Sequence, residues 1–153
     1  MEPMTLAYIR YTGPYEGNSE LFEKLYHKLY QWASPRGFVS EKTMNITVYH
    51  DHIDVTDQEK LRISVSITVP PETEVTGEIG KMTLPGGRYA CARFHLTSSD
   101  YYDAWQWVFS GWLPKSGYQP GDGPGFEYFP FIQKEAGSTG KLTVDICIPV
   151  KPL

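Results

Sequence analysis

The stretch GFEYFPF, residues 125–131, places one carboxylate in a run of aromatic rings. Aromatic side chains favour a half-buried strand, whereas glutamate is a poor strand former. An unpaired carboxylate removed from water is costly, so Glu127 must be solvated, paired or raised in pKa. Two interpretations stay open: Glu127 lies on a wet face or beside Lys or Arg, or it is the counter-charge for a cationic ligand.

Strand geometry divides this stretch between two faces. Alternate side chains point to opposite sides, so Glu127 and Phe129 share one face while Phe126 and Tyr128 share the other. We expect Phe126 and Tyr128 to pack against the helices, which leaves Glu127 and Phe129 facing a groove. A cation held there gains about 0.5–2 kcal/mol from each ring that it faces. Glu127 is therefore the first candidate ligand-binding residue, with Phe129 beside it.

The chain shows no pattern typical of a metal, cofactor or catalytic site. In HDHIDVTD, residues 50–57, His50 and His52 could share a strand face, but we predict that this polar segment is a turn. Cys91 and Cys147 lie in apolar stretches without CxxC spacing, and we expect reduced, buried thiols. No serine elbow or glycine-rich phosphate loop is present. We expect no cofactor, no metal and no catalytic residue.

Composition limits the classes of partner. With 153 residues, 41% hydrophobic and 21% charged, the chain is long enough for one domain, which we expect over residues 1–153. The net charge of −4 disfavours nucleic-acid binding. No stretch approaches the roughly 18 apolar residues of a membrane span. The beginning of the chain does not resemble a secretory signal, so we expect a cytoplasmic location.

The elements that must position Glu127 occur twice. The segments KLRISVSITVP (60–70) and KLTVDICIPVKP (141–152) both start with Lys-Leu and close at Pro, 81 residues apart. Likewise LYQWASPRGF (29–38) matches FSGWLPKSGY (109–118) at an offset of 80, and YIRY (8–11) matches CARF (91–94) at 83. The small drift indicates a duplication. The halves are residues 5–70 and 77–152, approximately.

Each half is predicted to run strand, helix, strand, strand. The first helix begins at Asn18 or Ser19, which are natural N-caps. Its apolar stripe comprises Leu21, Leu25, Leu29 and Trp32, and the stripe of the second helix comprises Tyr101, Trp105, Phe109 and Trp112. A short extra strand at 77–84 joins the halves. This order predicts an α+β fold: an antiparallel sheet with both helices on one face and a central groove along a pseudo-twofold axis.

The repeat adds a second candidate to the groove. At an offset of 80, Thr47 is equivalent to Glu127 and Tyr49 is equivalent to Phe129. Tyr49 should therefore enter the groove from the first half, unless it is an ordinary edge tyrosine. Only one of the two equivalent positions at the pseudo-twofold axis is then negatively charged, because Thr47 carries no charge.

Three further aromatic residues are weaker candidates. Trp107 lies off the apolar stripe of its helix, so it borders the groove, contacts a partner or is simply exposed. Tyr89 and Tyr8 lie on the first strand of each half, and core packing accounts better for one of them.

Five stretches, in the right order, carry a resemblance to a known family. They are LAYIRYTGPYE at Leu6, VYHDHID at Val48, LPGGRYACARF at Leu84, AWQWVFSGWLPKSGY at Ala104 and PGFEYFPF at Pro124. Together they resemble GyrI-like domains, the effector-binding domains of many AraC- and MerR-type multidrug regulators, which also occur as stand-alone proteins. The resemblance implies duplicated modules around a groove that binds small, often cationic and aromatic molecules. It also implies that Glu127, in the FE motif, is the counter-charge.

The resemblance leaves two other functions open. Some members hydrolyse strained electrophiles with the groove glutamate and a neighbouring aromatic hydroxyl, and others bind and inhibit a protein. Two departures bear on this: Phe129 stands where a tyrosine is common, and Leu96 stands where the first half has Gly13. We expect a binding module without catalysis and without direct contact to nucleic acid. Its natural ligand stays open, as does action alone, as a homodimer or beside a separate DNA-binding protein.

Overall fold

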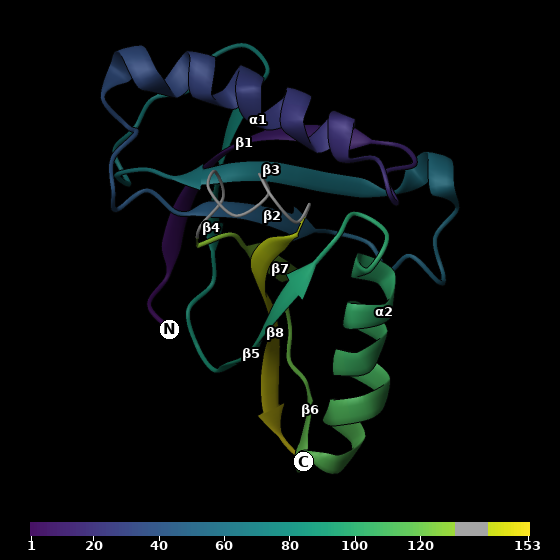
Figure 1. The fold of residues 1–153 in the computed structure, drawn as a ribbon. Coiled ribbons are helices and arrows are strands. Elements are labelled where there is room, and N and C mark those ends of the chain that lie inside the picture. The colour runs from purple at the N-terminus through teal and green to yellow at the C-terminus, as the bar shows by residue number, and fades with distance from the viewer. Residues whose placement is uncertain (131–140) are drawn as a thin grey trace.

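The computed structural model describes residues 1–130 and 141–153 (Figure 1). The first half runs strand, helix, strand, strand, as the repeat predicts. Its elements are β1 Met4–Thr12, α1 Ser19–Ala33, β2 Asn45–Tyr49 and β3 Arg62–Thr68.

The second half repeats this order with two additional strands. Its elements are β4 Ile79–Leu84, β5 Tyr89–Leu96, α2 Tyr101–Gln106, β6 Tyr118–Pro120, β7 Gly125–Tyr128 and β8 Leu142–Pro152. The chain continues from α2 as a π-helical segment, Trp107–Trp112. Phe131, which belongs to the aromatic stretch expected to form β7, lies outside the described residues.

The strands of the described residues form one antiparallel sheet of eight strands in the order β4-β1-β3-β2-β7-β8-β5, with β6 paired to β8. The halves meet where β2 pairs with β7, and there Thr47 lies directly opposite Glu127. The predicted α+β class is confirmed.

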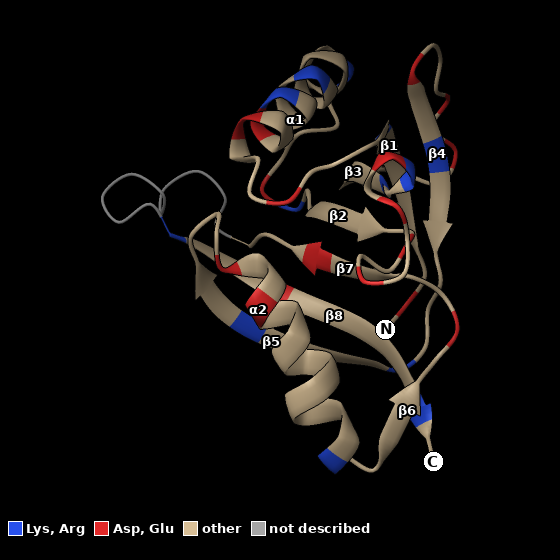
Figure 2. Ribbon diagram, turned by 90° about the vertical axis from the view of Figure 1, so that its right-hand side faces the viewer, with Lys and Arg blue, Asp and Glu red and all other residues tan. Residues whose placement is uncertain are grey.

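Both helices cover the same face of this sheet (Figure 2). Tyr26 of α1 hydrogen-bonds to Thr47, and Trp105 of α2 hydrogen-bonds to Glu127. Cross-strand partners in an antiparallel pair point to the same side. Because Thr47 and Glu127 are such partners, the two helices must lie on one side, as predicted.

Matching signals begin and end the helical segments. The Oδ1 atom of Asn18 accepts a first-turn backbone N–H at 3.1 Å, which caps α1 as expected. Leu29 of α1 is fully buried over the sheet. Gly37 and Gly117 follow the two helical segments with φ of 76° and 81°, a left-handed conformation that glycine adopts without strain. These glycines are 80 residues apart, which agrees with the repeat.

The sheet has a second buried layer on the side away from the helices. Phe126 packs there with Ile46, Val48 and Cys147. We expected Phe126 and Tyr128 to pack against the helices, and that prediction is wrong. Alternation divides a strand into two faces but does not tell which face the helices cover. Glu127 consequently lies on the helix-covered face, and the groove is between the helices.

Candidate functional site

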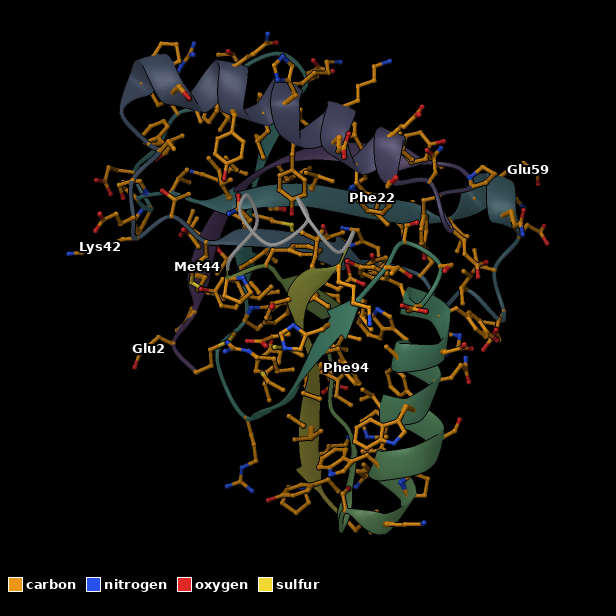
Figure 3. All side chains as sticks on the ribbon, in the orientation of Figure 1. Glu2, Phe22, Lys42, Met44, Glu59 and Phe94 are labelled. Atoms are coloured by element: carbon orange, nitrogen blue, oxygen red, sulfur yellow. The ribbon has the colours of Figure 1, made fainter. Side chains whose placement is uncertain are left out.

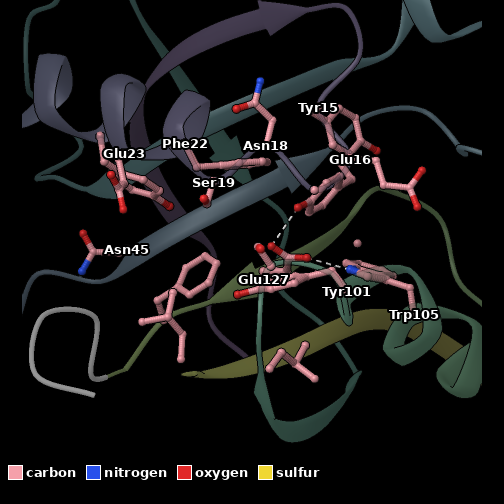
Figure 4. A pocket seen from close by; sticks show the side chains of 18 of the residues that line it. Tyr15, Glu16, Asn18, Ser19, Phe22, Glu23, Asn45, Tyr101, Trp105 and Glu127 are labelled. Carbon is pink, nitrogen blue, oxygen red and sulfur yellow. Dashed lines mark hydrogen bonds between the residues drawn. The ribbon is translucent and has the colours of Figure 1, made fainter. Parts of the chain in front are cut away.

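A large groove opens on the helix-covered face, over the junction of β2 and β7 (Figure 4). Its volume is about 2020 Å³, which exceeds the ~300–1,000 Å³ of most small-molecule sites. Rings from both halves line it: Tyr15, Phe22, Tyr26, Tyr30, Tyr49, Tyr101, Tyr102, Trp105, Phe109 and Phe129. Such a lining offers large apolar area with hydroxyl groups for orientation.

Glu127 lies on the floor of this groove with only 1% of its surface exposed. Its Oε1 atom accepts a hydrogen bond from the hydroxyl of Tyr49 at 2.8 Å. Its Oε2 atom accepts one from the indole N–H of Trp105 at 2.7 Å. The dashed lines in Figure 4 mark these two bonds. Each carboxylate oxygen therefore accepts one hydrogen bond from a neutral donor, and the two donors come from the two different halves of the chain.

The environment of Glu127 makes its charge sensitive to pH near neutrality. Burial raises the pKa of this carboxyl from 4.5 to about 7, although the hydrogen bonds from Trp105 and Tyr49 oppose the shift. The pKa of the Tyr49 hydroxyl is raised far above 10 by burial and by Glu127. Tyr49 therefore remains a neutral donor, while Glu127 exchanges a proton in the physiological range.

Aromatic contacts fix the two donors in place. The Tyr49 ring lies 5.3 Å from the Trp105 ring and 5.5 Å from the Tyr15 ring, measured between centroids. Trp105 in turn stacks on Phe109 at 6.2 Å. Phe129, which also lines the groove, contacts Tyr26 edge-on at 6.4 Å between ring centroids. The floor is thus bordered by rings from both helices, from β2 and from the residue that follows β7.

Gly125 makes this arrangement possible on β7. A Cβ atom at Gly125 would lie 3.0 Å from the Trp105 ring, which is too close without a shift of the indole. The absence of a side chain at this position lets Trp105 lie across β7 and reach Glu127. Gly125 is also the cross-strand partner of Tyr49, so the glycine opens space between the two donors.

The charged residues of the lining are of one sign. Among the described residues the lining carboxylates are Glu16, Glu23, Glu41, Asp51 and Glu127, and the lining contains neither Lys nor Arg. Asp51 is compensated by Arg62, at 2.9 Å, from outside the groove. Glu16 and Glu23 lie on the α1 side of the opening (Figure 4). A concave surface of this charge raises the local concentration of cations.

The structure brings together three of the six candidate residues. Glu127, Tyr49 and Phe129 all line the groove.

The other three candidates lie away from the groove lining. Trp107, the first residue of the π-helical segment, is 51% exposed and contacts Phe94 of β5 with ring centroids 5.9 Å apart (Phe94 in Figure 3). Tyr89 packs on Phe126 on the opposite side of the sheet and donates its hydroxyl to the Pro85 carbonyl. Tyr8 lies under the Arg10 guanidinium at 5.0 Å.

Sequence reasoning missed Trp105, which it assigned to the apolar stripe of the second helix. All four residues of that stripe do pack against the core of the second half, but they are only partly buried, and the buried residues beside them are Ala104, Val108 and Leu113. Trp105 is left half-buried at the groove. Tyr15 and Tyr26 were also missed, and nothing local in the sequence distinguishes them from core tyrosines.

The described residues contain no group of three or more His, Cys, Asp or Glu side chains that could hold a metal ion. His50 accepts or donates a hydrogen bond with Ser64 at 2.8 Å, and burial lowers the pKa of His50 to about 4. Within the described part of the chain, every helix is too short or too polar to cross a bilayer.

Comparisons with known proteins identify the family of this chain. The family of GyrI-like small molecule binding domains matches residues 1–151. A DNA gyrase inhibitor of Citrobacter rodentium is 26% identical over 156 residues, covering 100% of this chain and 94% of its own length. The expected family resemblance is confirmed.

Solved structures show the same fold. EcmrR, in the cryo-EM structure of its DNA complex, matches with a TM-score of 0.81 and 14% identity over 100% of this chain, which spans only 56% of that longer chain. A hydrolase from Listeria innocua matches with a TM-score of 0.61 and 10% identity, over 98% of this chain and 88% of its own. At these identities the likeness concerns the fold.

Proposed function

This chain belongs to the family of GyrI-like small molecule binding domains, and we propose that its groove binds small cationic aromatic molecules with Glu127 as the counter-charge. It would act as a stand-alone effector-binding or sequestering module, alone or together with a separate DNA-binding protein. The binding function requires no catalysis.

The observation that carries this proposal is a buried carboxylate whose described neighbours are neutral donors. Glu127 is held by Tyr49 and Trp105, and the described lining contains no Lys or Arg. Two neutral hydrogen bonds do not offset burial, which is why the pKa of Glu127 is raised to about 7. A ligand cation would supply the missing charge and favour the ionised carboxylate.

The rings around Glu127 supply the rest of the affinity. Tyr49, Trp105 and Phe129 line the groove together with the carboxylate. A flat apolar cation would gain from area burial and from cation–π attraction of about 0.5–2 kcal/mol for each ring that it faces. Selectivity for positive charge would come from Glu127, and tolerance of shape from the width of the groove.

The proposal is tested by titration with tetraphenylphosphonium, a cation whose charge does not change with pH. Trp105 borders the carboxylate, so tryptophan fluorescence should report binding. At pH 8 the Glu127→Gln variant should bind this probe at least about tenfold more weakly, since it keeps the shape but loses the charge. Triphenylphosphine oxide, a neutral relative of the probe, should bind both proteins equally.

The matched control is Glu41→Gln, which removes a carboxylate from the exposed part of the lining. Its affinity for the cation should change less than about twofold, because exposed charges are screened. Equal affinity of wild type and Glu127→Gln for tetraphenylphosphonium would refute the proposal.

A hydrolase is a second candidate, and the contact between Tyr49 and Glu127 favours it. A carboxylate with a pKa near 7 suits a general base, and the Tyr49 hydroxyl lies within hydrogen-bonding distance. Phe129 offers no second hydroxyl. This candidate requires turnover of a strained electrophile such as styrene oxide, lost in Glu127→Gln and reduced in Tyr49→Phe with the circular dichroism unchanged. No turnover by wild type rejects it.

Inhibition of a protein is a third candidate, favoured by the exposed Trp107 beside Phe94 and by the name of the Citrobacter rodentium relative. A supercoiling assay with purified DNA gyrase tests it directly. If the chain inhibits gyrase through this surface, Trp107→Ala should abolish inhibition while Glu127→Gln should not. No inhibition by wild type rejects this candidate for gyrase.

A further inference from the structure

The two cysteines, which we expected to be separate buried thiols, are neighbours in the sheet. Cys91 of β5 is the direct cross-strand partner of Cys147 of β8. Cys147 is buried, but Cys91 is exposed to solvent, so the prediction of a second buried thiol is wrong. The sheet thus pairs one accessible thiol with one protected thiol, although more than fifty residues separate them in the chain.

The backbone geometry is compatible with a bond between the two sulfur atoms. Directly opposed residues of an antiparallel pair have Cα atoms about 4.5–5.5 Å apart, and disulfides span about 4.4–6.8 Å. The next pair on this face shows that side chains meet across these strands. Arg93 and Asp145 are opposed in the same register and form an ion pair at 2.7 Å.

The surroundings make the two thiols chemically unequal. A hydrogen bond from the Cys147 thiol lowers the pKa of Cys91. The same bond and burial raise the pKa of Cys147. Thiolate is the reactive form of cysteine, and exposure governs access to an oxidant. Cys91 therefore has the properties of an attacking thiol, and Cys147 those of a protected partner held beside it.

We propose that Cys91 and Cys147 are a redox pair that forms a reversible intramolecular disulfide on reaction with a hydroperoxide. The Cys91 thiolate attacks one peroxide oxygen, the O–O bond breaks, and the sulfenic acid forms while the other oxygen leaves as water or an alcohol. The sulfur of Cys147 then attacks the sulfenic sulfur, the S–S bond forms, and the hydroxyl leaves as water with the Cys147 proton. Both sulfurs are oxidised, and the peroxide is reduced.

The disulfide would stabilise the edge of the sheet without changing the ligand groove. β5 is an outer strand held through β8, so a covalent link between the two strands restrains it. Cys147 packs on the side of the sheet away from the helices, whereas Glu127 faces the groove on the helix side. Oxidation should raise Tm by about 5–10 °C. It should leave the affinity for tetraphenylphosphonium unchanged, so this inference stands or fails independently of the proposed function.

The experiment exposes the reduced protein to one equivalent of hydrogen peroxide at neutral pH. Thiol titration should show the loss of both free thiols, and intact mass should show the loss of two hydrogen atoms from a monomer. Dithiothreitol should restore both thiols and the original Tm.

Single variants separate the two roles. In Cys147→Ser, Cys91 should still react, and dimedone should trap its sulfenic acid. In Cys91→Ser, thiol loss should be at least about tenfold slower, because the remaining thiol is buried. The proposal is overturned if wild type keeps both thiols, if Cys91 only gains oxygen atoms, or if the disulfide links two chains.

Discussion

The central strands β2 and β7 hold equivalent positions in the two halves, yet they carry different chemistry. In the first half, Thr47 shares a hydrogen bond of 3.0 Å with Tyr26 of α1. In the second half, Glu127 accepts a bond of 2.7 Å from Trp105 of α2. Thr47 and Glu127 are repeat equivalents and also direct cross-strand partners, so both lie at the pseudo-twofold axis.

The difference shows how a duplicated fold acquires a single charged point. The Thr47 hydroxyl is neutral and is satisfied by one helix residue, Tyr26. Glu127 has two carboxylate oxygens to satisfy, and Trp105 of its own half supplies only one hydrogen bond. The second comes from Tyr49 of the first half, which carries a hydroxyl that its repeat equivalent Phe129 lacks. The asymmetry of the axis therefore depends on residues in both halves.

Thr47→Glu removes the difference between the two central strands and should have the largest effect on stability. It would place a second carboxylate at a fully buried position, directly opposite the first. At pH 8 we expect the free energy of unfolding to fall by about 4 kcal/mol, since like charges without solvent repel and lack donors. Urea denaturation measures this change. The control Thr47→Val should lower the free energy of unfolding by about 1 kcal/mol. If the two variants were equally stable, water would have to reach the Thr47–Glu127 pair, which contradicts the burial of both residues.

Trp105→Phe tests how much the hydrogen bond from α2 to Glu127 contributes to stability. The ring remains, but the donor to the Glu127 carboxylate is lost, and a hydrogen bond to a charged group contributes about 2 kcal/mol. The loss of stability should be larger at pH 8 than at pH 6, because Glu127 has a pKa of about 7 and is mostly protonated at the lower pH. Urea denaturation at both pH values tests this, and a loss independent of pH would contradict it.

The affinity for a permanent cation should rise with pH in wild type only. The cation requires the carboxylate form of Glu127, which predominates above the pKa of about 7. Between pH 6 and pH 8 the ionised fraction, and with it the affinity for tetraphenylphosphonium, should increase roughly tenfold. Fluorescence titration measures the profile. Glu127→Gln should give a flat profile, and a flat profile in wild type would show that Glu127 does not recognise the charge.

Tyr26→Phe, the counterpart of Trp105→Phe in the first half, should have the smallest effect. It removes one neutral hydrogen bond to Thr47, and this should cost about 1 kcal/mol of unfolding free energy. Because Thr47 does not titrate, the loss should be the same at pH 6 and pH 8. A pH-dependent loss, measured by the same denaturation experiment, would show that the two sides of the axis are not independent.

Much of the site was predictable because its key features are local or repeated. The duplication predicted the order of elements, and the N-cap at Asn18 follows from local chemistry. Glu127 is conspicuous because a carboxylate is rare among strand aromatics, and its repeat equivalence to Thr47 led to Tyr49. These inferences need only periodicity and residue type.

Trp105 and the position of the groove were not predictable in this way. The apolar spacing predicts that Trp105 packs on the core, and it does, but the same indole also lines the groove and donates a hydrogen bond to Glu127. The contact between Trp105 and Glu127 also requires Gly125, whose missing side chain admits the indole. Each of these is a relation between elements that the chain order does not express.

By itself, the sequence determined the duplicated α+β architecture and the presence of one acid in an aromatic strand, since hydrophobic periodicity and repetition act within short segments. Only the tertiary structure decided that Glu127 lies on the helix-covered face with donors from both halves. It alone brought Cys91 against Cys147. The physical reason is that strand alternation separates two faces without telling them apart, and the packing of helices and the pairing of strands then decide which face becomes the groove.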